Sequence, residues 1–358
     1  MGTFKTFERF NNLDVDTKKI PFPIPLESLD YNDINSEATA INCAFVSGIL
    51  NDFIDDKILY PTVSGRMSSS SFDFKIDTNN MPFKIEVANS QIEIDGGYEG
   101  ETSLTIIEAK NYISSDFLIR QLFYPYRLWS RKINKKVRTV FLTYSNGTFH
   151  LREYSFLDVN SYNSITLTKE RKYVVYEGEI NLENIQKIID STDIVQEPDI
   201  PFPQANSFER VINLCEILYQ KGELTRDDLL SNYDFTKKEK LDKRQINYYT
   251  DAARYLGLVD KKLQDKQVTY FLSKEGLALF NLNIIDRQLK FVELILSHAI
   301  FKRTLQLYLD NSQAPLRKEI VPIMIELQLY NIGEHSTFFR RASTILAWTN
   351  WIMNLIEE

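Results

Sequence analysis

The sequence predicts a domain of mixed α and β structure with a mixed sheet, followed by mostly helical domains. Residues 36–180 alternate between runs with apolar residues at helical spacing and short runs rich in β-branched and aromatic residues, which favours an α/β or α+β layer. From residue 205 onward the apolar spacing is mostly helical. Pro198, Pro201 and Pro203 interrupt both patterns and therefore mark a domain boundary.

The composition is that of an ordinary globular chain. Of its 358 residues, 43% are hydrophobic and 25% are charged, so the length suits two or three domains with real cores. A formal net charge of −7 excludes a protein that is positive all over. It leaves nucleic acid open as a partner because local charge clusters set the field. Two basic clusters lie within 131–138 and 237–244, although such runs more often form solvated surface.

The cysteines and the hydropathy pattern predict a cytoplasmic protein with no membrane segment. Cys43 and Cys215 lie within apolar helical patterns, as expected of buried free thiols in a reducing compartment. The first residues lack an apolar stretch of secretory length, and no 18-residue uncharged run occurs.

The first domain, predicted over residues 1–195, begins with a helix over 36–56 and continues with strands. A second helix over 114–129 is expected to start at a Ser/Asp cap and to be disturbed at Pro125. Asn146-Gly147 predicts a tight hairpin between two strands. The predicted strands span 84–88, 91–95, 103–110, 137–144, 148–156 and 172–180, the first two joined by a turn at 89–90.

The second domain, predicted over 205–282, has the element order of a winged helix-turn-helix. Residues 207–222 predict a helix, 225–233 a short helix and 240–259 a longer helix with basic and aromatic residues. Two strands follow around a polar turn, and a helix closes the domain. The remaining residues, 283–358, predict a third, helical module of DNA-binding or dimerising type without an obvious wing.

Acidic residues and a lysine gather where two predicted strands end. Side chains alternate along a strand, so Glu108 and Lys110 emerge on the same face. Asp95 comes next to Glu108 if the two strands pair through the glycine-containing connection 96–102. Two such close carboxylates repel unless a divalent cation lies between them, and oxygen ligands suit Mg²⁺. A neighbouring lysine can orient a water for attack on phosphorus. A salt-bridged surface strand end is the alternative interpretation.

Asp95 followed by Glu108-Ala109-Lys110 resembles the PD-(D/E)xK nuclease superfamily, which contains most restriction endonucleases. The order of helix, three strands, helix and further strands over 36–180 fits a restriction-endonuclease-like core. The resemblance implies that Asp95, Glu108 and the Ala109 carbonyl bind Mg²⁺ and that Lys110 is the catalytic lysine. It also suggests Glu37 and Gln121, on the flanking helices, as accessory residues.

Three groups of residues are predicted to contact DNA. The first lies on the longer basic helix, where apolar residues such as Ile246 can face a core while polar residues stay outside. The second lies on the last helix, which resembles the final helix of a DNA-binding module that accompanies some restriction-type proteins. The third lies within 64–74, for which a flexible surface loop is the alternative. In this order the residues are Lys243, Arg244, Gln245, Asn247, Tyr248 and Arg254; Ser336 as a helix cap with Arg340 and Arg341; and Arg66 with Ser68.

These patterns and the resemblance together imply a Mg²⁺-dependent, site-specific endonuclease of double-stranded DNA, namely a type II restriction enzyme. Cutting both strands requires two active sites, so a homodimer is expected, and a cognate DNA methyltransferase is the implied genetic partner. Two alternatives stay open: a non-catalytic winged-helix DNA-binding regulator, and another defence or repair nuclease of the same fold. The three scattered histidines do not support a zinc site.

Overall fold

The structure is a computed structural model that describes most of the chain in two compact units. The described residues are 4–6, 15, 17–23, 26–77, 81–114, 116–175, 178–232, 243–264, 267–329 and 335–356, with the backbone alone for 4–6, 231–232, 243–244 and 335–337. We refer to the described residues up to 175 as unit 1 and to those from 178 onward as unit 2.

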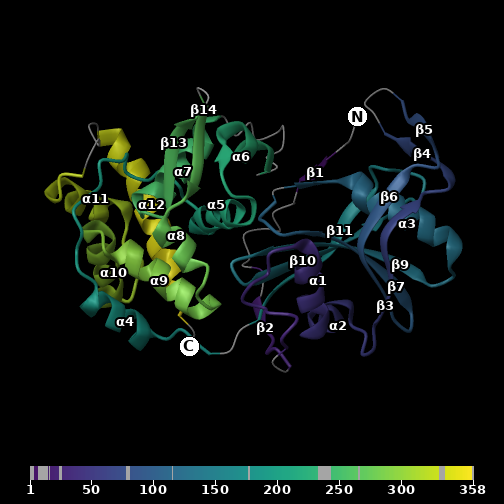
Figure 1. The fold of residues 1–358 in the computed structure, drawn as a ribbon, viewed down its shortest axis with the longest axis horizontal. Coiled ribbons are helices and arrows are strands. Elements are labelled where there is room, and N and C mark those ends of the chain that lie inside the picture. The colour runs from purple at the N-terminus through teal and green to yellow at the C-terminus, as the bar shows by residue number, and fades with distance from the viewer. Residues whose placement is uncertain are drawn as a thin grey trace. The chain divides into compact units, whose positions relative to one another are not determined.

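A seven-stranded mixed sheet forms the centre of unit 1 (Figure 1). The strand order is β2-β11-β10-β9-β7-β6-β3. β7 pairs with β9 and β2 pairs with β11 in parallel, and the other neighbours are antiparallel. The predicted mixed α and β class with a mixed sheet is thus confirmed. The strands are β2 (Thr17–Lys19), β3 (Tyr60–Ser68), β6 (Gln91–Glu99), β7 (Ser103–Lys110), β9 (Lys136–Ser145), β10 (Thr148–Phe156) and β11 (Ile165–Val174).

Helices cover both faces of this sheet. Ile107 and Ala109 of β7 share one apolar cluster with α1 (Glu37–Val46) and α2 (Ile49–Ile54). Leu104 and Ile106 of the same strand share a cluster with residues at the end of α3 (Ile119–Lys132). β7 is therefore buried on both sides, and the alternation of its side chains follows the prediction. Two short strand pairs complete unit 1: β1 (Phe4–Thr6) with β8 (Asp116–Leu118), and β4 (Ser71–Ile76) with β5 (Phe83–Ala88).

The glycines after Asp95 do not form the expected bend. Gly96 and Gly97 lie inside β6, opposite Ile107 and Ile106 of β7, and the connection between the strands is only 100–102. A Cβ on Gly97 would come within 2.7 Å of the Val63 Cβ of β3. The glycine is thus explained by close approach of the neighbouring strand rather than by a turn.

Two further local predictions in unit 1 were wrong. The helix expected over 114–129 begins only after Leu118, because β8 begins at Asp116, within the expected Ser/Asp cap. The segment 64–74 is not a flexible loop, because most of it lies in β3 and β4. The two strands predicted on either side of residues 89–90 are present as β5 and β6, although β5 pairs with β4 and β6 with β3 and β7.

A buried ion pair joins β9 and β10 beneath α2. The Arg138 guanidinium donates to both Glu153 oxygens, at 2.8 Å and 2.6 Å, and to the Ile54 carbonyl. These side chains are only 15% and 8% exposed. Arg138, one of the basic cluster residues, thus serves the core and is not available to phosphate.

Replacement of Arg138 by alanine is expected to lower the free energy of unfolding by roughly 3 kcal/mol, because the Glu153 carboxylate would stay buried without a counter-charge. Urea denaturation of the variant measures this loss. Lys135→Ala is the control, since the side chains of its ion pair with Glu99 are 39% and 35% exposed, and such a pair should contribute about 0–1 kcal/mol. Equal effects of the two substitutions would contradict the argument.

Unit 2 is mostly helical and contains one small sheet (Figure 1). The sheet has the strand order β12-β14-β13. The elements around it occur in the predicted order of helix, short helix, longer helix and hairpin, with the short strand β12 added between the first two helices. The strands are β12 (Leu224–Thr225), β13 (Val259–Gln264) and β14 (Gln267–Leu272). The helices are α4 (Leu182–Ser191), α5 (Phe208–Lys221), α6 (Arg226–Asn232), α7 (Lys243–Tyr255), α8 (Lys274–Leu279), α9 (Ile284–Leu296), α10 (Ala299–Asn311), α11 (Arg317–Glu326) and α12 (His335–Met353).

The proline-rich segment before α5, residues 198–206, packs against the helices of unit 2. Phe202 is 3% exposed and stacks on Phe301 of α10. The Trp348 indole donates to the Ala205 carbonyl at 2.8 Å, and the Thr344 hydroxyl donates to the Asn206 side chain at 2.8 Å. α12 therefore fixes the backbone of this segment.

Candidate functional site

Two strand ends bring the predicted acidic residues together in unit 1. The β6–β7 register pairs Gly96 with Ile107, which directs Asp95 toward the end of β7. One Asp95 carboxylate oxygen accepts a hydrogen bond from the Ala109 backbone N–H at 2.9 Å. This contact fixes Asp95 beside the Glu108-Ala109-Lys110 segment.

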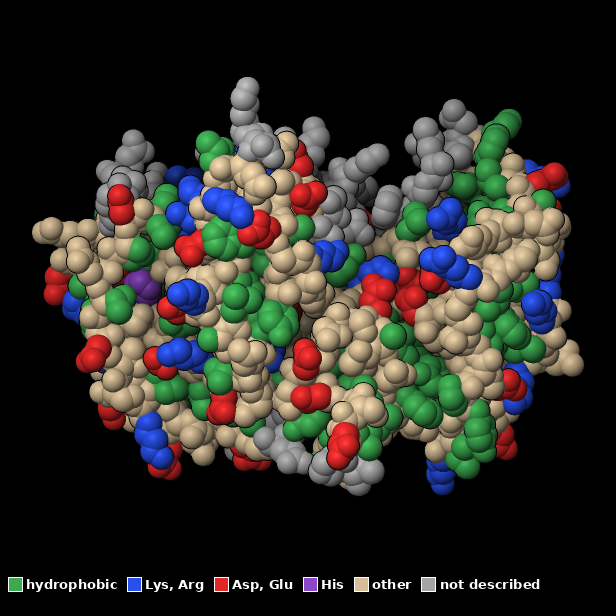
Figure 2. Space-filling view, in the orientation of Figure 1, with side chains coloured by type: hydrophobic (Ala, Val, Ile, Leu, Met, Phe, Trp, Pro, Cys, Tyr) green, Lys and Arg blue, Asp and Glu red, His purple; other side chains and the backbone are tan. Residues whose placement is uncertain are grey.

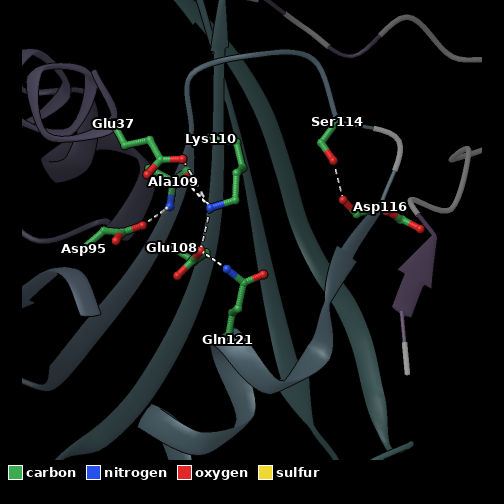
Figure 3. A network of polar contacts seen from close by, with 8 residues as sticks. All are labelled: Glu37, Asp95, Glu108, Ala109, Lys110, Ser114, Asp116 and Gln121. Atoms are coloured by element: carbon green, nitrogen blue, oxygen red, sulfur yellow. Dashed lines mark hydrogen bonds and ion pairs between the residues drawn. The ribbon is translucent and has the colours of Figure 1, made fainter. Parts of the chain in front are cut away.

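The Lys110 ammonium lies at the point where several oxygens converge (Figure 3). Its Nζ is 2.7 Å from Glu108 Oε1, 2.9 Å from the Ala109 carbonyl oxygen and 3.2 Å from Glu37 Oε1. Glu37 comes from the first turn of α1, so a helix on the other side of β7 also contributes to the site. A cation is thus held by two carboxylates and one carbonyl.

Gln121 reaches the same cluster from α3. Its side-chain amide donates to Glu108 Oε1 (Figure 3). Gln121 lies in the first turn of α3, so the helix position determines where the amide points. Both residues suggested as accessory, Glu37 and Gln121, therefore contact the central Glu-x-Lys pair.

Burial shapes the electrostatics of the site. Glu108 is only 6% exposed. Burial raises the pKa of its carboxyl to about 7; the charges of Asp95 and Glu37 add to the shift, and Lys110 opposes it. Burial lowers the pKa of Lys110, but the surrounding carboxylates outweigh burial and leave this pKa raised. The proton therefore stays on Lys110 Nζ, which remains a cation.

A polar cavity of about 380 Å³ opens over this cluster. The cavity is lined by Asp95 and by the four side chains linked through the contacts above, namely Glu37, Glu108, Lys110 and Gln121. Six other lining residues were not predicted as site residues, namely Gln91, Ile92, Glu93, Arg120, Tyr124 and Pro125. Alternation along β6 could have identified Gln91 and Glu93, which share the face of Asp95, and helical spacing could have identified Arg120 and Tyr124 beside Gln121. The Arg120 guanidinium carbon lies 5.9 Å from the centre of the Tyr124 ring.

The residues proposed for DNA contact lie in different surroundings. Arg66 and Ser68 are exposed on β3, and Arg66 Nε is 3.3 Å from Glu93 Oε1. On α7, Gln245 is exposed, Asn247 and Tyr248 are half-buried, and Arg254 is held by Asp251 at 2.9 Å. Arg340 is exposed and Arg341 half-buried on α12. Lys243, Arg244 and Ser336 lie in helices, but their side chains are outside the described residues. Ser336 follows the first residue of α12 and so lies inside the helix, not at its cap.

Positive charge is not concentrated on the face that Figure 2 shows. Lysine and arginine side chains are interspersed there with acidic and hydrophobic ones among the described residues. Any anion that binds this face must therefore be recognised by local groups rather than by a broad field.

Together these features define a mixed α/β domain with a buried acid-lysine cluster at the edge of a polar cavity, followed by a helical unit. Residues 2–174 match a family described as a domain of unknown function (DUF6997), and residues 210–357 match another domain of unknown function (DUF7226). Neither description names an activity. No curated protein and no solved structure matches the chain. Among the described residues, no helix has the length and apolar character needed to cross a membrane.

Proposed function

We propose that the protein is a Mg²⁺-dependent DNA endonuclease of the PD-(D/E)xK type, specifically a type II restriction enzyme that hydrolyses double-stranded DNA. The observation that carries the proposal is the convergence of Asp95, Glu108 and Lys110 at one cavity, with the Ala109 carbonyl beside them. These residue types can hold a divalent metal ion and orient water for phosphodiester hydrolysis.

The donor set fits Mg²⁺. No cluster of three or more His, Cys, Asp or Glu side chains that could hold a metal occurs within the described ranges. The set is instead two carboxylates, Asp95 and Glu108, and the Ala109 carbonyl. Mg²⁺ is commonly bound by one or two carboxylates, with water and substrate phosphate oxygens completing its shell. Both oxygens already contact one cationic group, the Lys110 ammonium, which supports their assignment to the same metal ion.

The chain's own residues would then carry out hydrolysis as follows. Bound Mg²⁺ would supply Lewis-acid stabilisation of negative charge on the phosphate. Lys110 Nζ donates hydrogen bonds that orient the attacking water and stabilise the charge that develops on a phosphate oxygen. The water oxygen bonds to phosphorus as the bond to the leaving oxygen breaks. The proton that the water loses passes to solvent, and the leaving oxygen takes up a proton from solvent, so the net change is the addition of one water across the phosphodiester bond. Gln121 and Glu37 act as positioning residues, because they contact Glu108 and Lys110.

Unit 2 is proposed to hold the DNA. Its order of α5, β12, α6, α7, β13 and β14 is that of a winged helix, with residues 205–282 as the winged-helix domain and 283–358 as a further module. A homodimer would supply two active sites for the two strands, and a DNA methyltransferase would protect the cell's own DNA. The proposed site of action is the cytoplasm.

The winged-helix order also favours a second candidate, a non-catalytic DNA-binding regulator. This candidate gives no reason for a lysine buried among three carboxylate neighbours. Another defence or repair nuclease of the same fold would share the site and differ only in substrate choice.

Discrete DNA cleavage is the expected result when the protein is incubated with unmethylated genomic DNA and Mg²⁺. EDTA should abolish cleavage because the carboxylates would lose their metal, and methylation of the recognition site should block it. Gel electrophoresis of the products, with methylated DNA in parallel, measures both effects. A gel shift without cleavage under every metal and methylation condition would favour the regulator.

A further inference from the structure

A second polar cavity, of about 300 Å³, lies within unit 2. Three segments far apart in the sequence build it: residues 204–206, α7 and α12. The lining includes three amides, two tyrosines and one arginine, namely Gln204, Asn206, Gln245, Tyr248, Tyr249 and Arg340.

Buried contacts fix the segments that line this cavity. The buried Trp348 indole donates to the Ala205 carbonyl at 2.8 Å, and the buried Thr344 hydroxyl donates to Asn206 Oδ1 at 2.8 Å. These two contacts fix the 204–206 segment on α12. α7 is anchored on its other side by Ile246 and Ala253, which are fully buried. The cavity is therefore preformed, which lowers the entropy cost of binding.

The chemistry of the lining selects for a planar ligand with hydrogen-bonding edges and negative charge. Amide side chains offer both donors and acceptors, as base edges require. Tyr248 and Tyr249 offer ring faces for stacking, and burial raises the pKa of Tyr249 so that its phenol stays neutral. Arg340 supplies a positive charge, and no carboxylate lines the cavity among the described residues. A guanidinium matches the oxygens of phosphate in a bidentate geometry.

We propose that this cavity binds a single nucleotide, with its base among the amides and tyrosines and its phosphate at Arg340. The volume lies at the small end of the range for small-molecule sites, which suits one nucleotide. A paired base presents only its edges to the grooves, so a DNA nucleotide must leave the stack to enter a cavity. The source is either such an extruded nucleotide, which rests on the proposed DNA substrate, or a free mononucleotide, which does not.

Binding measurements on the full chain in EDTA separate these sources. In the first arm, fluorescence anisotropy compares a fully paired labelled duplex with the same duplex carrying one unpaired base. Extrusion of an unpaired base costs less, and we expect roughly tenfold tighter binding, which corresponds to about 1.4 kcal/mol. In the second arm, isothermal titration calorimetry follows binding of the four deoxynucleoside monophosphates.

Variants of the lining test whether either effect comes from this cavity. Gln245→Ala changes an exposed side chain and should not affect folding, and Tyr248→Ala removes a ring face. Arg340→Ala removes the proposed phosphate contact. Arg303→Ala is the matched control, because it removes an arginine of α10 that pairs with Glu326 outside the cavity.

A preference for the unpaired base that disappears in Gln245→Ala and Tyr248→Ala but persists in Arg303→Ala supports an extruded nucleotide. Monophosphate binding lost in Arg340→Ala, without any preference among duplexes, supports a free nucleotide. Absence of both effects, or their persistence in all lining variants, overturns the proposal. Cleavage with Mg²⁺ is measured separately. Nucleotide binding without cleavage would refute the proposed nuclease function alone. Cleavage without either binding effect would refute only the proposed nucleotide binding in this cavity.

Discussion

Replacement of Lys110 by alanine is expected to lower the rate of DNA cleavage by about three orders of magnitude, the usual contribution of one positioned proton donor. The structural reason is that Lys110 Nζ contacts Glu108, Ala109 and Glu37 at 2.7–3.2 Å. When a metal ion takes the Glu108 and Ala109 oxygens, the ammonium remains beside them, where it can donate to the water and the phosphate. Single-turnover cleavage of a plasmid with Mg²⁺ measures the change.

Lys135→Ala is a well-matched control for this prediction. Lys135 Nζ also contacts one carboxylate, Glu99 at 2.7 Å, and one carbonyl, Gly100 at 2.9 Å, but it lies outside the cavity. The control should retain its cleavage rate. Alanine could also weaken the fold, because it removes the apolar stem of the side chain. Lys110→Met keeps an apolar stem and removes only the ammonium, so it should show the same loss of cleavage rate. A cleaving Lys110→Met variant with native circular dichroism would contradict the assigned role.

The centre of the site could be predicted from the sequence because it depends on one strand. Alternation along β7 is a local property, and it predicted that Glu108 and Lys110 share a face. The prediction that Asp95 lies beside Glu108 rested on a bend that does not form. The glycines that suggested a bend lie within β6, and the pairing register of β6 and β7 directs Asp95 to Ala109. Register depends on long-range packing, which a single sequence does not reveal.

The parts that could not be predicted depend on contacts between distant segments. Thr344 reaches Asn206 across 138 positions of the chain. The contact of Glu37 with Lys110, across 73 positions, was suggested by the family resemblance and not by any local pattern. The helical patterns predicted α1, α7 and α12 but contained no information on which faces would meet. Of the strand pair β4–β5, only β5 was predicted, over 84–88; β4 was missed because a polar serine-rich run is typical of loops.

Metal binding is expected to stabilise unit 1 through the same oxygens that now hold Lys110. A divalent cation at about 100 times its dissociation constant stabilises a folded domain by about 2.7 kcal/mol. For a domain of this size the shift in Tm is then about 5–10 °C. Differential scanning fluorimetry with Mg²⁺ or Mn²⁺, against EDTA, measures the shift without requiring catalysis. Asp95→Asn and Glu108→Gln should abolish it, because each removes one charged ligand.

The Lys110→Ala variant should respond in the opposite direction to these ligand variants. Its Glu108 carboxylate and Ala109 carbonyl no longer hold an ammonium, so a metal ion does not have to displace one. The variant should unfold earlier than the wild type in EDTA, because a buried carboxylate loses its counter-charge. It should then gain a larger Tm shift at low metal concentration, with roughly tenfold tighter binding from about 1.4 kcal/mol of lost competition. An unchanged or smaller shift would mean that Lys110 and the metal do not share these oxygens, and the proposed ligand set would have to be abandoned.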